Sequence, residues 1–117
     1  MRERGFLGEK IAANYLKKAG YTIVDTNYAC RMGEIDIIAK EGEYLVFVEV
    51  KLRKNDDFGG GAFAVDKRKQ ERIRRTALHY MQTKHINAFV RFDVVLLYGD
   101  GNKFKKEDIE VIRNAFY

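Results

Sequence analysis

The stretch that decides the fold is GEIDIIAKEGEYLVFVEVKLR, residues 33–53. Both halves of this stretch are rich in β-branched and aromatic residues, and such runs are typical of β-strands. Between them lies EGE, residues 41–43, whose glycine favours a tight reversal of the chain. The stretch therefore predicts a hairpin of two antiparallel strands, residues 34–40 and 44–53.

Charged residues interrupt the apolar pattern of the second strand. Because side chains alternate along a strand, one face carries a row of valines and the other face a mixed row. The mixed row begins with Leu45 and Phe47 and ends with Glu49 and Lys51. Charges at the end of an apolar row are costly unless they are paired or bound to a metal ion.

Asp36 interrupts the first strand in the same way. The opposite face of that strand is expected to carry Ile35, Ile37 and Ala39. Directly paired residues of an antiparallel hairpin lie on the same face of the sheet. A two-residue loop over Glu41 and Gly42 would pair Asp36 with Phe47, and a four-residue loop would pair it with Glu49. Both bring Asp36 to the face of Glu49 and Lys51. A three-residue loop without a bulge would not.

Two interpretations of this acidic and basic face stay open from the pattern alone. One is an ordinary salt bridge between Lys51 and either Asp36 or Glu49. The other is a metal site, because two converging carboxylates repel each other and a divalent cation with oxygen ligands, Mg²⁺ or Mn²⁺, removes that repulsion. Lys51 would then orient water or neutralise charge on a phosphate, as metal-assisted phosphodiester hydrolysis requires.

Helical and strand-like patterns alternate along the rest of the chain. A helix is predicted over residues 3–19, followed by Gly20, and a second helix runs to residue 84 with Asp66 as its N-cap. Further strands are predicted at residues 21–28, 89–98 and 109–112. A loop is predicted at residues 54–61 and a turn at residues 99–102. The order α-β-β-β-α-β-β predicts one α/β domain over residues 1–117 with a mixed sheet.

Short motifs along nearly the whole chain resemble those of one bacterial family. GEIDII at residues 33–38, followed by FVEVKLR at residues 47–53, looks like the core of PD-(D/E)xK nucleases. The other matching positions are Gly5, Gly8 and Glu9, Ala12, Tyr15 and Leu16, Asn27-Tyr28, Cys30-Arg31, Phe58-Gly59, Val65, Lys69-Gln70, Arg72-Ile73, Arg91-Phe92-Asp93 and Asn114-Ala115-Phe116. With these motifs the chain resembles the YraN-type family, which is similar to archaeal Holliday-junction resolvases.

This resemblance implies a restriction-endonuclease-like fold, with a central mixed five-stranded sheet flanked by helices. It implies that Asp36 and Glu49 bind Mg²⁺ or Mn²⁺ and that Lys51 is the catalytic lysine. Glu9 matches the first-helix acid that completes such sites as a metal ligand in resolvase-like members. From its pattern alone, Glu9 would be a solvated charge near a helix start.

The sequence departs from the motif at three positions. Ile35 stands where the motif's name has Pro, although only the following acid binds metal. Leu52 and Ala29 stand where Thr and Arg are expected, which concerns contacts with the substrate.

Basic residues are concentrated near the start of the second helix. Six of the nine residues from 67 to 75 are basic, namely Lys67, Arg68, Lys69, Arg72, Arg74 and Arg75. Such a run is either a solvated helix face or a surface that binds phosphates without sequence preference. Arg31, Arg53 and Lys54 flank the predicted site and are expected to contact a phosphate near the metal.

Composition excludes several kinds of chemistry. The chain has 117 residues, a net charge of +5 and no Ser, Pro or Trp, so a serine nucleophile is excluded. Its one cysteine, Cys30, cannot form an intramolecular disulfide, which favours the reducing cytoplasm. One Cys and two His residues are too few for a structural zinc site. The longest apolar runs are far shorter than a membrane span, and no secretory signal is visible.

Two functional hypotheses follow. The first is an Mg²⁺-dependent endonuclease that cuts structured DNA, for example a four-way junction. Resolving a junction needs two cuts related by a two-fold axis, which a homodimer supplies. The second is a nucleic-acid-binding module on a nuclease fold, which does not cut and acts with a DNA-processing partner.

Overall fold

The computed structural model describes residues 2–53, 65–99 and 104–117, with the backbone alone for residues 2–6. The elements are α1 (Arg2–Lys18), β1 (Thr22–Cys30), β2 (Gly33–Glu41), β3 (Tyr44–Arg53), α2 (Lys67–Lys84), β4 (Phe89–Tyr98), the 3-10 helix η2 (Lys106–Asp108) and β5 (Ile109–Phe116). The predicted order of helices and strands is confirmed. The loop predicted at residues 54–61 and the turn residues 100–102 lie outside the described part of the chain.

A local signal explains the start of α2, whereas a tertiary contact explains the end of β5. Asp66 caps α2 as predicted, because its Oδ1 atom accepts a hydrogen bond of 2.8 Å from the backbone nitrogen of Lys69. The last strand continues to Phe116, four residues beyond the predicted end. Asn114 in this strand has a φ of +54°, and its backbone nitrogen donates to Oδ1 of Asp93 at 3.0 Å. A tertiary bond thus holds the strand at a position where the local sequence does not.

The five strands form one mixed sheet in the order β1-β2-β3-β4-β5. Strands β3 and β4 are parallel, and the other neighbouring pairs are antiparallel. Helix α2 lies in the connection between the two parallel strands, as a βαβ crossover requires. The predicted mixed five-stranded sheet with flanking helices is therefore confirmed, and the architecture is compatible with a restriction-endonuclease-like fold.

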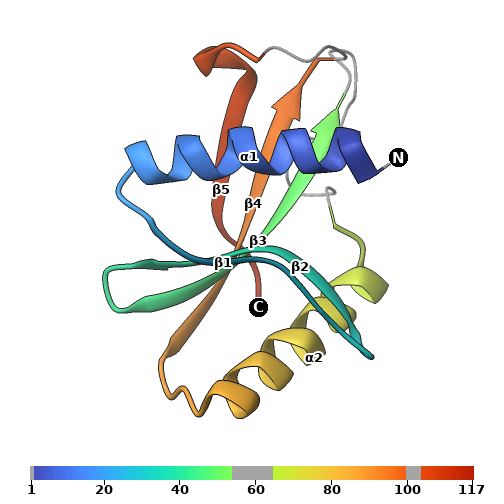
Figure 1. Ribbon diagram of the computed structural model, residues 1–117, viewed down its shortest axis with the longest axis vertical. Coiled ribbons are helices and arrows are strands. Elements are labelled where there is room, and N and C mark those ends of the chain that lie inside the picture. Colours follow the sequence, from blue (N-terminus) through green and yellow to red (C-terminus); the bar gives the residue numbers. More distant parts are fainter. Residues whose placement is uncertain (1, 54–64, 100–103) are drawn as a thin grey trace.

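The two helices cover opposite faces of the sheet. Val46 and Val48 of β3 are buried in a cluster with Ala12 and Leu16 of α1. The alternate residues Leu45 and Phe47 are buried with α2 in a second cluster, whose helix residues include Ile73, Ala77 and Tyr80. Figure 1 shows α1 crossing the strands near one end of the sheet and α2 running past the other end. The site carried by β2 and β3 therefore has a helix on each side.

The hairpin register corrects one detail of the predicted faces. Glu41 pairs with Tyr44, and the ladder ends at Ile37 opposite Val48. Ile37 is buried under α1, but Ile35 is buried under α2, so the two do not share a face. The alternation breaks at Asp36, opposite a stretch of β1 in which Asn27 has a φ of +54°. A residue in the left-handed region bends the strand pair locally, which period-two alternation cannot anticipate.

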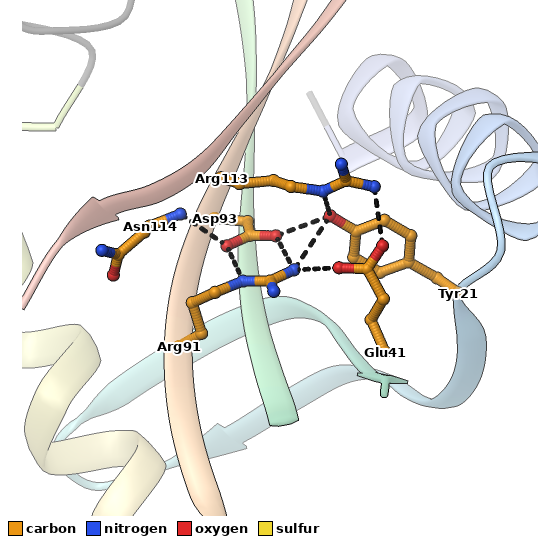
Figure 2. A network of polar contacts seen from close by, with 6 residues as sticks. All are labelled: Tyr21, Glu41, Arg91, Asp93, Arg113 and Asn114. Atoms are coloured by element: carbon orange, nitrogen blue, oxygen red, sulfur yellow. Dashed lines mark hydrogen bonds and ion pairs between the residues drawn. The ribbon is translucent and has the colours of Figure 1, made fainter. Parts of the chain in front are cut away.

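A buried polar network joins the start of β1 to the last two strands (Figure 2). Asp93 is fully buried and accepts hydrogen bonds from Nε and Nη2 of Arg91, both at 2.9 Å. The hydroxyl of Tyr21 donates to Asp93 at 2.7 Å and accepts from Arg91 and Arg113. Glu41 completes the network by pairing with both arginines. The buried charge of Asp93 is thus compensated, as burial of an ion requires.

Candidate active site

Asp36 lies where β2 and β3 separate. The backbone nitrogen of Val50, two residues past the last paired position of β3, donates a hydrogen bond of 2.8 Å to Oδ2 of Asp36. The Asp36 side chain on β2 therefore accepts from a backbone N–H of β3 beyond the last backbone pairing of the two strands. This bond fixes the Asp36 carboxylate at the opening between the strands.

Glu49 is the next acidic side chain on β3 and is only 5% exposed. Its Oε2 atom lies 2.7 Å from the ammonium nitrogen of Lys69 on α2. Burial, together with the charge of Asp36, raises the pKa of Glu49 to about 7, and the charges of Lys69 and Lys51 oppose that rise. Two neighbouring carboxylates thus compete for the same positive charge.

Glu9 of α1 reaches the same place from the other side of the sheet. Burial raises the pKa of Asp36 to about 6, and the charge and hydrogen bond of Glu9 contribute to the rise. The bond from Val50 and the charge of Lys69 act in the opposite direction. The Oε1 atom of Glu9 is shielded from solvent. Asp36 therefore interacts with both Glu9 and Glu49.

Asp36 and Glu49 border a pocket of about 210 Å³. Its lining residues are Gly33, Glu34, Asp36, Glu49, Lys69, Arg72 and Ile73. The pocket is thus formed by β2, β3 and the first turns of α2, and it combines carboxylates with two basic side chains. Clusters of titratable groups with shifted pKa values in a pocket are typical of functional sites.

The other predicted site residues fall into four groups. Lys51 is half-buried on β3, two residues after Glu49, and its charge acts on that carboxylate. Arg31 and Arg72 line a neighbouring, larger pocket. Arg53, at the end of β3, and Lys67 and Arg68, in the first turn of α2, line neither of these two pockets. Lys54 lies outside the described residues.

A hard divalent cation fits the donor chemistry of the acids, which offer carboxylate oxygens only. Burial raises the pKa values of Asp36 and Glu49, and repulsion from a neighbouring carboxylate adds to the rise; a bound cation would remove that repulsion. In residues 7–53, 65–99 and 104–117, however, no three His, Cys, Asp or Glu side chains are grouped as a metal ion would require. The ammonium group of Lys69 instead provides positive charge at Glu49. The carboxylate oxygens thus suit a divalent cation, which would compete with Lys69 for Oε2 of Glu49.

Comparison with known proteins places the chain in a family. The model of "Uncharacterised protein family UPF0102" matches residues 8–97. The chain belongs to the UPF0102 family. A UPF0102 protein of Syntrophus aciditrophicus is 49% identical over 115 residues, which cover 96% of this chain and 87% of that protein. A UPF0102 protein of Caldicellulosiruptor saccharolyticus is 46% identical over 116 residues, covering 98% of each chain. One from Legionella pneumophila (strain Philadelphia 1) is 44% identical over 117 residues, covering 98% of this chain and 95% of its own.

The predicted YraN-type membership is confirmed, because UPF0102 is that family. The part matched by the UPF0102 model includes all four predicted catalytic positions, Glu9, Asp36, Glu49 and Lys51. In the described ranges, neither helix has the length and apolar character needed to span a membrane.

Sequence reasoning missed three features of the site. It assigned Lys69 to an outer basic surface, whereas the structure pairs it with Glu49. It did not anticipate the hydrogen bond from Val50 to Asp36, which exists only because the strands diverge there. It did not predict that Arg75 and His79 line a pocket together with Arg31. The spacing of three to four residues puts Lys69, Arg72, Arg75 and His79 on one side of a helix. That spacing could have indicated this shared pocket.

Proposed function

We propose that this protein is a metal-dependent endonuclease that hydrolyses phosphodiester bonds of structured DNA. The observation that carries the proposal is the pair of carboxylates Asp36 and Glu49, which line a pocket together with basic side chains, while Glu9 acts on Asp36 through its charge and a hydrogen bond. Burying like charges costs free energy. Binding of a cation and an anionic substrate would account for carboxylates kept together at this cost.

The residues of the candidate site have different roles in the proposed reaction. Glu9, Asp36 and Glu49 would hold Mg²⁺ or Mn²⁺. The bound cation supplies neutralisation of phosphoryl charge and a lower pKa for water. Lys51 stabilises the negative charge that develops on the phosphate. Val50 keeps Asp36 in place through its backbone nitrogen.

The basic residues near the site would bind the phosphates of the DNA substrate. Arg31, Lys69 and Arg72, which line the two pockets, contact phosphates. Arg53, Lys67 and Arg68 extend this basic surface, and Lys54, which lies outside the described residues, stays a predicted phosphate contact. Cutting a four-way junction at two related positions requires a homodimer, so a Holliday-junction substrate implies that two copies act together. The free thiol of Cys30 is consistent with action in the cytoplasm.

One observation favours a second candidate function. Lys69 neutralises Glu49 without any metal, and the described acids form no ready group of three metal ligands. A nuclease fold that binds DNA without cutting it, and acts with a DNA-processing partner, would have such a self-neutralised site.

A cleavage assay separates the two. The purified protein is incubated with linear, flap and four-way-junction DNA in Mg²⁺, in Mn²⁺ or in EDTA. We expect cleavage with either metal and none in EDTA, and we expect Asp36→Asn and Glu49→Gln to abolish it. The matched control is Glu43→Gln, which removes an exposed acid from the hairpin turn. Cleavage that persists in EDTA and in the Asp36 variant would contradict the metal site, and salt-sensitive binding without any cleavage would favour the second function.

A further inference from the structure

A second pocket, of about 600 Å³, opens beside the carboxylate pocket. Its lining residues are Arg31, Met32, Glu71, Arg72, Arg75 and His79. They come from the turn between β1 and β2 and from one side of α2. Arg72 lines both pockets, so the two are neighbours along α2. A chain-like ligand bound at the acids can therefore continue into this second pocket.

The charges of the second pocket leave positive potential for a ligand. Arg75 donates from Nε to Glu71 at 3.1 Å, and Glu71 also accepts from Arg74 at 3.0 Å. The single acid of the lining is thus already shared by two arginines. In the described part of the chain, the guanidinium groups of Arg31 and Arg72 have neither a hydrogen-bond nor an ion-pair partner. Guanidinium groups bind phosphate oxygens in pairs, which makes two available arginines a fit for a phosphate.

His79 adds an oriented donor to this lining. Its Nδ1 atom lies 2.6 Å from the hydroxyl of Tyr28, a partly buried residue packed against the α2 core. When the tyrosine hydroxyl donates to Nδ1, the ring proton is on Nε2, which then donates. Tyr28 thus fixes the orientation of the His79 ring, and with the hydroxyl as donor the Nε2 proton is available to a ligand. A histidine held in this way binds a phosphate oxygen without needing a charge.

We propose that this arginine and histidine pocket is a nucleotide subsite, which binds the phosphate next to the scissile phosphodiester on the same strand. The inference rests on the proposed function, because the scissile phosphate must lie at the acids. Met32 supplies an apolar surface for the sugar or base of the same nucleotide. The volume exceeds that of a phosphate alone, and Arg72 lies between the two phosphate positions. The phosphate belongs either to the interior of a strand or to a strand end.

Binding in EDTA tests the subsite without any cleavage. Labelled four-way-junction DNA with terminal 5′-phosphates, or with 5′-hydroxyls, is titrated with protein, and affinity is measured by fluorescence anisotropy from 50 to 200 mM salt. We expect Arg31→Gln with Arg72→Gln to weaken binding at least tenfold and to lower the salt slope by about 0.9 for each phosphate that is no longer neutralised. His79→Gln should weaken binding about threefold. The control Lys17→Gln with Lys18→Gln removes two exposed charges from α1.

The outcomes distinguish this inference from the proposed function. A loss of affinity in the double arginine variant that equals the loss in the control would overturn the subsite, even if the wild type cleaves DNA. A selective loss supports the subsite even if no cleavage is found with any metal. If the selective loss needs a terminal phosphate, the pocket binds a strand end, and if it does not, the pocket binds an internal phosphodiester. Thermal melting of each variant identifies those that fail to fold, and for these the single Arg31→Gln variant replaces the pair, with a fivefold loss expected.

Discussion

The ammonium nitrogen of Lys69 lies 2.7 Å from Oε2 of Glu49, so a cation from α2 neutralises a buried acid of β3. Lys69 is 37% exposed at its side chain and Glu49 is 6% exposed. The lysine therefore enters the site from its solvent side. Its charge also opposes the rise in the pKa of Asp36. In the absence of metal, one side chain thus supplies the compensation that a divalent cation would supply to both acids.

Lys69 should therefore compete with metal for Glu49. We expect Lys69→Met to tighten binding of Mn²⁺ about tenfold, because the ion no longer displaces an ion pair. Isothermal titration calorimetry without DNA measures the affinity directly, with Lys17→Met as a control that removes a lysine from the exposed side of α1. Equal affinities in the wild type and in Lys69→Met would show that the ammonium group does not occupy the metal position.

The two acids should make the stability of the metal-free protein depend on pH. Their pKa values are raised by folding, to about 6 for Asp36 and about 7 for Glu49, so the native state holds protons that the unfolded chain releases. The free energy of unfolding contributed by these groups should therefore fall as the pH rises from 4 to 7 and stay low above that.

This pH dependence is measured by thermal unfolding in EDTA at pH 5 and pH 8. Relative to the wild type, Asp36→Asn with Glu49→Gln should reduce the difference in melting temperature between the two pH values. The remaining difference belongs to the other titrating groups of the protein. An unchanged difference in the double variant would show that neither carboxylate has a raised pKa.

The contribution of the Val50–Asp36 hydrogen bond to stability can be measured by comparing two substitutions of Asp36. Asparagine keeps an oxygen that accepts from the backbone nitrogen of Val50, whereas alanine leaves that nitrogen without its acceptor. Both substitutions remove the repulsion with Glu49. We therefore expect Asp36→Asn to exceed Asp36→Ala in free energy of unfolding by about 1–2 kcal/mol, the usual effect of leaving a buried donor unsatisfied. Urea denaturation at pH 8 provides the comparison.

Loss of the network around Asp93 should destabilise the fold. Asp93→Ala leaves Arg91 and the hydroxyl of Tyr21 without their shared acceptor, so we expect a loss of about 3–5 kcal/mol in free energy of unfolding. Tyr21→Phe removes only the hydroxyl and should cost about 1–2 kcal/mol. Tyr117→Phe is the control, because its side chain belongs to a residue that is 88% exposed. Chemical denaturation ranks the three, and DNA binding should be unaffected at temperatures where each variant is folded.

Local pattern was sufficient for the elements and for part of the site. The β-branched runs on both sides of Gly42 predicted the hairpin, and the hairpin then brought Asp36 and Glu49 together. The predicted faces were wrong for Ile35, because the alternation breaks beside Asp36. The last strand was predicted too short, since Asn114 is held there by Asp93, which is distant in sequence. The alternation of side chains along a strand predicts neither a local bend nor a contact with a distant strand.

By itself, the sequence determined the order of the elements, the mixed sheet, the family and the identity of the acids that meet. These follow from short-range periodicity and from motifs, both of which are written in consecutive residues. Only the tertiary structure decided which cation neutralises Glu49, since Lys69 and Lys51 are both candidates until α2 packs on the sheet. It also decided that Arg31 and His79 line one pocket. Such pairings depend on the distance between elements, and that distance is set by how the cores under α1 and α2 pack.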